Sequence, residues 1–169
     1  MPKPIVFVSR RLLEPGLSMV TDHCQAQVWD DPLPPPYKDL LRLVRGVDGL
    51  LCLLTDRIDP EVLDAAGPGL KVISNCAVGV DNVDLKEATR RGIPVGNTPG
   101  VLTEATADHT FALLMAAGRR LMEGTRQVHA GEWKTWSLDG LLGVALSVAA
   151  RGIIGFGRNV VVREPIGVC

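Results

Sequence analysis

The sequence predicts an α/β fold, in which a parallel five-stranded sheet with helices on its faces is followed by a long helix. Short apolar runs, too short for helices, alternate with helical segments between residues 5 and 96. Proline and glycine mark the boundaries between them. Since crossover connections between parallel strands are right-handed, this alternation places helices on both faces of one sheet. With 169 residues and 18.1 kDa, the chain has room for one full domain and part of a second.

Five runs have the length and composition of strands. Most are continuously apolar, which is typical of strands buried on both faces, whereas residues 26–29 alternate in character and suit an edge strand. The strands are predicted at residues 5–8, 26–29, 49–54, 70–73 and 93–96. The commonest order for five such strands is 2-1-3-4-5, the flavodoxin-like order.

Four helices are predicted to connect the strands. The third has the clearest boundaries, because Asp59 can cap its first turn, Pro60 occupies its first position and Gly67 can close it. In the fourth, Asp84 and Glu87 have the spacing of a capping box, with Asp in the Ser/Thr role. The helical segments are residues 16–22, 37–44, 60–66 and 85–91, and the four prolines of residues 30–36 make that stretch a loop.

A longer helix begins near Thr103, which can serve as its N-cap. A second helical segment, residues 123–130, stops at Gly131. Trp133 and Trp136 follow in a loop, where large aromatic side chains either fill an interface or pack within the chain. Residues spaced three or four apart place an apolar face on the longer helix, which consists of Ala107, Phe111, Leu114, Gly118 and Leu121.

The candidate site lies where the strands end. In the 2-1-3-4-5 order, residues 9–11 and 54–56 face one another across the switch point between strands one and three, with the Val78-Gly79 turn beside them. Gly79 lets the backbone approach a bound anion closely. An ordinary strand-to-helix turn is the alternative. Arg10 and Arg11 could steer an anion, or they could be a solvated surface pair.

Charge and composition exclude several classes of function. A net charge of −1 gives no electrostatic case for binding nucleic acid or an acidic membrane. No apolar run approaches the roughly 20 residues of a membrane span, and no signal peptide is recognisable. The four cysteines lack metal-ligand spacing, so no metal site is predicted, and reduced thiols in a cytoplasmic protein are expected.

A glycine-rich turn comes near the end of the chain. Residues 152–157 indicate a strand that runs into a turn, with Gly155 for the tight bend and Gly157 for backbone approach to a pyrophosphate. The third position of this dinucleotide-binding pattern is Val160 instead of glycine. The pattern is therefore incomplete.

Several motifs in series resemble the D-isomer-specific 2-hydroxyacid dehydrogenases. They are Val-Gly-Val-Asp at 78–81, Arg-Arg-Gly-Ile-Pro-Val-Gly-Asn-Thr-Pro at 90–99, Leu-Thr-Glu-Ala-Thr-Ala-Asp at 102–108 and Gly-Ile-Ile-Gly-Phe-Gly-Arg at 152–158. Leu-Leu-Cys-Leu-Leu-Thr-Asp at 50–56 and the Trp133/Trp136 pair are similar to the glyoxylate reductase/hydroxypyruvate reductase branch. The resemblance extends from residue 5 to about residue 158 and is patchy over residues 137–151.

The resemblance implies two domains and assigns roles to residues. Residues 1–102 would be a flavodoxin-like substrate-binding domain, and residues 103–169 a hinge and dimerisation helix with the incomplete start of a Rossmann cofactor domain. Val78 and Gly79 would hold the substrate carboxylate, and Leu54 would line the pocket. The cofactor contacts would be Thr103, Gly155, Gly157, Arg158 and Asn159, and Trp136 would reach into the site of a partner subunit.

The resemblance also implies a reaction. A family enzyme of this branch transfers hydride from NAD(P)H, with NADPH favoured, to glyoxylate or hydroxypyruvate and gives glycolate or D-glycerate, as a homodimer. In the family, the Arg that orients the substrate and the His–Glu pair that delivers the proton follow the glycine turn. His23, His109 and His129 match none of these motifs, and residues 159–169 match nothing in the family.

No catalytic residue is therefore expected within the 169 residues, and this truncated chain is expected to be inactive alone. The alternative is a non-catalytic dimerisation module that pairs with a full-length reductase.

Overall fold

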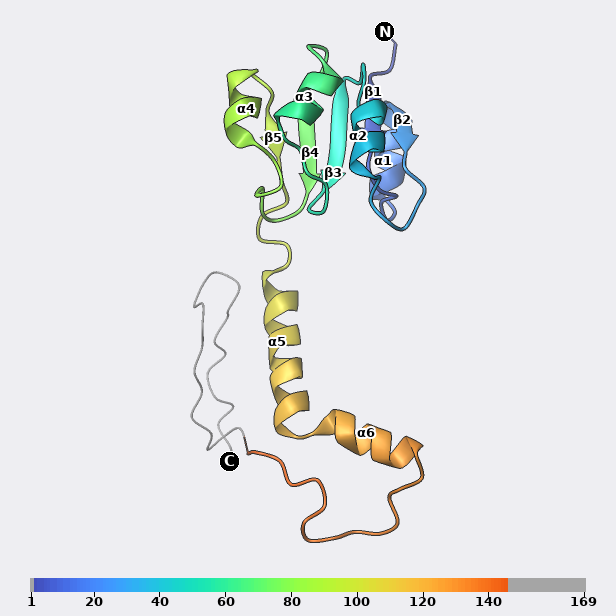
Figure 1. Ribbon diagram of the computed structural model, residues 1–169, viewed down its shortest axis with the longest axis vertical. Helices are drawn as coiled ribbons and strands as arrows, with labels where there is room; N and C mark the ends of the chain where they lie inside the picture. The colour runs from blue at the N-terminus through green and yellow to red at the C-terminus, as the bar shows by residue number, and fades with distance from the viewer. Residues whose placement is uncertain (1, 146–169) are drawn as a thin grey trace. The chain divides into compact units, whose positions relative to one another are not determined.

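The computed structural model describes residues 2–145 (Figure 1). The chain divides into two compact units, Met1–Gly100 and Val101–Cys169.

The first unit contains the predicted parallel sheet. Its strands are β1 (Ile5–Val8), β2 (Gln25–Val28), β3 (Gly49–Leu53), β4 (Val72–Cys76) and β5 (Val95–Gly96). Their order is β2-β1-β3-β4-β5 and every pairing is parallel, which confirms the 2-1-3-4-5 order. β2 lies at an edge, as its alternating composition predicted.

The fourth strand differs from its prediction. β4 begins two residues later than expected and continues to Cys76. Within the added residues, Asn75 is buried, whereas Ser74 and Cys76 on either side of it are exposed. The prediction ended the strand at Ile73, where the apolar run stops. A polar residue continues a buried strand when its hydrogen bonds are satisfied, and Asn75 has such partners. β4 is therefore buried on one face and exposed on the other.

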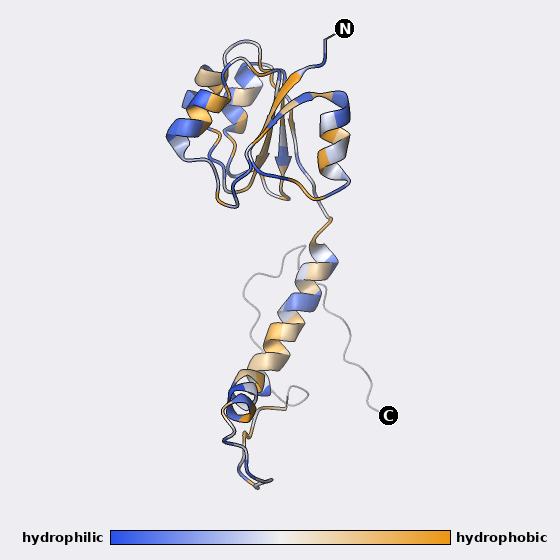
Figure 2. Ribbon diagram, turned by 90° about the vertical axis from the view of Figure 1, so that its right-hand side faces the viewer, coloured by the Kyte–Doolittle hydropathy of each residue, from blue (hydrophilic) through white to orange (hydrophobic). Residues whose placement is uncertain are grey.

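Helices lie on both sides of the sheet (Figure 2). They are α1 (Gly16–His23), α2 (Tyr37–Leu43), α3 (Pro60–Ala66) and α4 (Leu85–Arg90). The boundary residues predicted for α3 are confirmed: the carboxylate of Asp59 accepts a hydrogen bond from the Val62 N–H at 3.1 Å, and Gly67 has a φ of 82°. Only a residue that tolerates positive φ closes a helix in this way.

The capping box predicted at α4 forms only in part. The carboxylate of Asp84 accepts a hydrogen bond from the Glu87 N–H at 2.9 Å, as expected. The Asp84 N–H, however, donates to the carbonyl oxygen of Ile58 instead of to Glu87. Glu87 accepts hydrogen bonds from Arg90 and Arg91, which lower the pKa of its carboxyl to about 2.

The hydrophobic core of the first unit lies between the sheet and these helices. Its buried side chains come from the central strands and from the inner faces of α2 and α3. They include Phe7, Leu40, Val44, Leu50, Cys52, Ile58, Val62, Leu63 and Ile73, each at most 2% exposed.

The second unit contains α5 (Thr103–Gly118) and α6 (Leu121–His129). The predicted N-cap at Thr103 is wrong: Thr103 is the first helical residue, and no side chain caps α5. Leu102 is the N-cap because its carbonyl oxygen accepts the Thr106 N–H at 2.9 Å. α6 starts two residues earlier than predicted and stops before Gly131, which has a φ of 67°.

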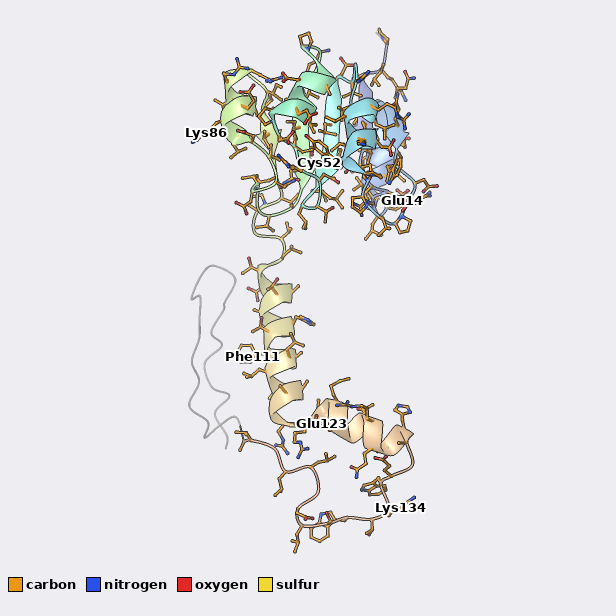
Figure 3. The ribbon with its side chains drawn as sticks, viewed as in Figure 1. Glu14, Cys52, Lys86, Phe111, Glu123 and Lys134 are labelled. Atoms are coloured by element: carbon orange, nitrogen blue, oxygen red, sulfur yellow. The ribbon has the colours of Figure 1, made fainter. Side chains whose placement is uncertain are left out.

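The hydrophobic residues of α5 are not confined to the predicted face, and much of its ribbon has the orange shades of hydrophobic residues in Figure 2. Of the five residues assigned to that face, Ala107 alone is buried, while Phe111 is 39% exposed. Its side chain projects outward from the helix in Figure 3. Leu113 and Met115, outside the predicted face, are 57% and 47% exposed. In the part of the chain that the structure describes, no helix combines the length and apolar character needed to cross a membrane.

Candidate functional site

The first part of the candidate site is the carboxyl end of β1 and β3, which meet as predicted. The guanidinium of Arg10 donates a hydrogen bond to Oγ1 of Thr55 at 3.1 Å, and the hydroxyl of Ser9 donates to the carboxylate of Asp56. Residues 9–11 and 54–56 therefore lie together at the switch point of the sheet.

The two arginines of this segment differ in environment. Arg10 has a side chain that is only 16% exposed, and it also donates to the carbonyl oxygen of Pro32 at 3.0 Å. Arg11 has a side chain that is 67% exposed and pairs with Asp30. The alternative of a solvated surface residue fits Arg11. Arg10 instead joins the loop after β2 to the loop after β3.

Asp56 is a buried carboxylate beneath the same edge. It accepts the Leu53 N–H at 2.7 Å in addition to the Ser9 hydroxyl, and its Oδ1 lies 3.9 Å from the Arg10 guanidinium. Removing a carboxylate in this position would leave buried donors without partners. Asp56 thus stabilises the segment that carries Leu54.

The second part of the site is the turn after β4, in which three successive carbonyl oxygens accept hydrogen bonds. The carbonyl of Ala77 accepts the backbone N–H of Thr98 at 2.8 Å. The carbonyl of Val78 accepts from Nδ2 of Asn97 at 2.8 Å, and that of Gly79 accepts from Nδ2 of Asn75 at 2.9 Å.

These bonds fix the direction of the N–H groups. In a planar trans peptide the N–H points opposite to the C=O of the same peptide unit. The N–H groups of Val78, Gly79 and Val80 therefore point away from the donors that hold the three carbonyls. None of the three donates a hydrogen bond within residues 2–145. Neighbouring unpaired backbone N–H groups form a binding site for an anion such as a carboxylate.

Access to these N–H groups depends on Gly79. Gly79 is exposed, whereas Val78 and Val80 are half-buried. A Cβ atom added at Gly79 would lie 3.3 Å from Oδ2 of Asp81, which is close enough to require a small shift. The absence of a side chain therefore leaves the backbone open where an anion would approach.

The two parts of the site are joined by Asn82. Its Nδ2 lies 3.0 Å from the carbonyl oxygens of Leu53 and Asp56, and its Oδ1 accepts from Nδ2 of Asn75 at 3.0 Å. A β-bridge between Ile58 and Val83 links the same two loops further along. The loop after β3 and the turn after β4 consequently form one connected structure.

Sequence reasoning missed the three asparagines. Asn75 lies in β4, Asn82 follows the Val78-Gly79 turn, and Asn97 comes directly after β5. The available signal was that short amide side chains at strand ends and turns commonly bond to nearby backbone groups. The sequence did not show which backbone groups these would be.

The cysteine nearest this network is not a nucleophile. Burial, followed by the charge of Asp56, raises the pKa of the Cys52 thiol to about 12, so it stays protonated at neutral pH. Figure 3 shows Cys52 within the sheet. Among residues 2–145, no group of three His, Cys, Asp or Glu side chains could hold a metal ion.

The other predicted site residues lie in different parts of the chain. Leu54 directly follows β3 and is 67% exposed. Thr103 and Trp136 belong to the second unit, where Trp136 is 74% exposed in the loop after α6, as predicted for a loop residue. The predicted cofactor contacts Gly155, Gly157, Arg158 and Asn159 lie outside the described residues.

The fold and this turn define an open α/β domain with unpaired backbone donors at the carboxyl edge of its sheet. Residues 6–156 match the family of the D-isomer specific 2-hydroxyacid dehydrogenase, catalytic domain. The chain therefore belongs to the D-isomer-specific 2-hydroxyacid dehydrogenase family.

Known relatives agree with this assignment. The chain is 50% identical to a glyoxylate reductase of Korarchaeum cryptofilum and 49% identical to one of Thermococcus litoralis, over 92% of its own length in each case. It covers 47% and 48% of those proteins, so it spans about half the length of the curated relatives it matches.

Solved structures give the same result. The TT0316 protein of Thermus thermophilus is 47% identical, with a TM-score of 0.79 over 83% of this chain and 45% of that one. A Polaromonas protein described as a D-isomer specific 2-hydroxyacid dehydrogenase, NAD-binding, is 32% identical, with a TM-score of 0.83 over 94% of this chain and 50% of that one.

Proposed function

We propose that the chain is the substrate-binding part of an oxidoreductase that reduces glyoxylate or hydroxypyruvate to glycolate or D-glycerate with NAD(P)H. The observation that carries this proposal is the turn of unpaired N–H groups at Val78, Gly79 and Val80. A 2-keto acid has a carboxylate next to its reacting carbonyl, so binding the carboxylate there would also position the carbonyl. Relatives named glyoxylate reductase support the choice of substrate.

The roles of the remaining residues follow from their positions. Leu54 lies exposed at the end of β3, on the loop that Asn82 joins to the turn, and would cover the apolar side of the substrate. Residues 1–102 would form the substrate-binding domain, and residues 103–169 the hinge and the start of the cofactor domain.

NAD(P)H would supply the hydride, and we propose NADPH as the preferred form. Its contacts would be Thr103, Gly155, Gly157, Arg158 and Asn159. Of these, only Thr103 belongs to the described residues, where it is the half-buried first residue of α5.

The first prediction concerns turnover. The 169-residue chain is expected to oxidise no NADPH above the blank with glyoxylate or hydroxypyruvate, because the family's proton donor follows the glycine turn. A chimera that continues this chain, from about residue 151, with the remaining part of the Thermococcus litoralis glyoxylate reductase is expected to restore turnover. Loss of NADPH absorbance measures both.

The intact Thermococcus litoralis enzyme is the positive control for that assay. A chimera that folds and binds NADPH but reduces neither substrate would contradict the proposed function. Turnover by the 169-residue chain alone would contradict the proposed absence of a proton donor.

We further propose that the complete protein is a cytoplasmic homodimer. The exposed apolar side chains of the second unit support an interface there, since patches of this kind are rarely left open to water. They include Leu113, Met115, Met122, Val128, Trp133 and Trp136. The same observation favours the alternative function, a dimerisation module that pairs with a full-length reductase.

Co-elution tests this alternative. The chain, mixed with a tagged full-length relative, is expected to elute with it in size-exclusion chromatography if the second unit is a pairing surface. Substitution of Trp136→Ala and Leu113→Ala together should weaken that pairing, because both side chains are more than half exposed. Separate elution of the unaltered chain at every concentration would exclude the module.

A further inference from the structure

We propose that Asn97 and Asn75 are positioning residues that keep the N–H groups of the Val78–Val80 turn directed toward a substrate carboxylate. This inference rests on the proposed function, because it concerns the same site. It adds residues to which neither the family motifs nor the sequence pattern assigned a role.

The need for such residues arises from the glycine itself. Gly79 leaves the backbone accessible, but glycine also accepts both signs of φ and does not favour one orientation of the adjoining peptide planes. Type I and type II turns differ mainly in the direction of one central peptide. If the Val78–Gly79 peptide turned over, its carbonyl oxygen would replace its N–H at the anion, and attraction would become repulsion.

Each asparagine holds one of the two peptides next to Gly79. Nδ2 of Asn97 donates to the Val78 carbonyl at 2.8 Å and so fixes the N–H of Gly79. Nδ2 of Asn75 donates to the Gly79 carbonyl at 2.9 Å and so fixes the N–H of Val80. The two amide side chains thus set the orientation that the glycine leaves free.

The two asparagines differ in how far they also stabilise the fold. Asn75 is 1% exposed and lies within 3.4 Å of the Cys52 thiol as well as 3.0 Å from Asn82, so its loss would leave buried polar groups without partners. Asn97 is exposed, and its only recorded side-chain hydrogen bond within residues 2–145 is the one to Val78. Substitution of Asn97 therefore tests the positioning role with little effect on the stability of the fold.

The experiment is a titration of the ¹⁵N-labelled 169-residue chain with sodium oxalate, a dicarboxylate that resembles glyoxylate and accepts no hydride. In the unaltered chain, the backbone N–H signals of Val78, Gly79 and Val80 are expected to shift. Asn97→Ala is expected to weaken oxalate binding about threefold to tenfold, the effect of losing one orienting hydrogen bond. The melting temperature should stay within about 2 °C, as for an exposed substitution.

Gln25→Ala provides the matched control. It removes an exposed amide side chain at the start of β2, away from the Val78–Val80 turn, so oxalate should bind as in the unaltered chain. Equal oxalate affinity of Asn97→Ala and the unaltered chain would overturn the positioning role while leaving the proposed function intact. If oxalate shifted none of the three signals in the unaltered chain, the proposed carboxylate site would fail and the positioning role with it.

Discussion

Leu50→Ala is expected to lower the free energy of unfolding of the first unit by about 3 kcal/mol, within the range of roughly 2–5 kcal/mol for large-to-small substitutions in a packed core. Leu50 is 1% exposed in β3, the central strand, and its backbone is in register with Phe7 of β1 and Ile73 of β4. A domain has only about 5–15 kcal/mol of stability in total. The loss would therefore be a large part of it.

Leu13→Ala is the matched control for this substitution. It makes the same chemical change at a side chain that is 89% exposed, so the effect should stay within about 0.5 kcal/mol. Urea unfolding followed by the backbone N–H signals of the five strands measures the first unit separately from the second. Similar effects of the two substitutions would contradict the packing described for β3.

Gly79→Glu is expected to weaken oxalate binding by at least about tenfold and to remove the oxalate-induced shifts at Val78 and Val80. The Cβ of the new side chain would lie only 3.3 Å from Oδ2 of Asp81, so the glutamate adds a second carboxylate near that of Asp81. These two negatively charged side chains would repel the carboxylate of oxalate at the backbone N–H groups of the turn. The oxalate titration measures this effect directly.

Gly69→Glu gives the same change of charge elsewhere on the first unit. A Cβ atom at Gly69 would meet only the Val47 carbonyl oxygen at 4.0 Å, and Gly69 lies in the loop before β4, at the opposite end of that strand from the turn. Oxalate binding should therefore be retained. Equal losses with both substitutions would show that net charge, and not the Val78–Val80 turn, governs the binding of the anion.

Local sequence signals were sufficient for much of the fold. Asp59, Pro60 and Gly67 act through their own backbone or through residues three positions away, so the boundaries of α3 could be predicted directly. The strand order followed from the repeated alternation of strands and helices. By contrast, the end of β4 depended on Asn75, whose burial is stabilised by partners that the local sequence does not show.

The candidate site, like the fold, could be predicted only in part from the sequence. The Val78-Gly79 turn could be found because a glycine after a buried strand is visible in the sequence. The donors that orient this turn could not be found in the sequence. Asn75 comes from β4, whereas Asn97 and Thr98 come from the segment after β5, so they meet at the turn only once the sheet has formed. The roles of Val78, Gly79 and Leu54 toward a substrate remain predictions.

The connection between the two loops has a consequence for the thermodynamics of binding. Both loops are already ordered in the first unit without a ligand. They are held by the Ile58–Val83 bridge, by the amide of Asn82 and by the hydrogen bond from the Ile58 N–H to the Asn82 carbonyl at 2.8 Å. A ligand that arrives at a surface already in its binding conformation loses little conformational entropy of the protein. Differences in affinity among small carboxylates at this edge should then be governed by their shape complementarity to the turn and by the cost of their desolvation. Ordering of the loops around them should contribute little.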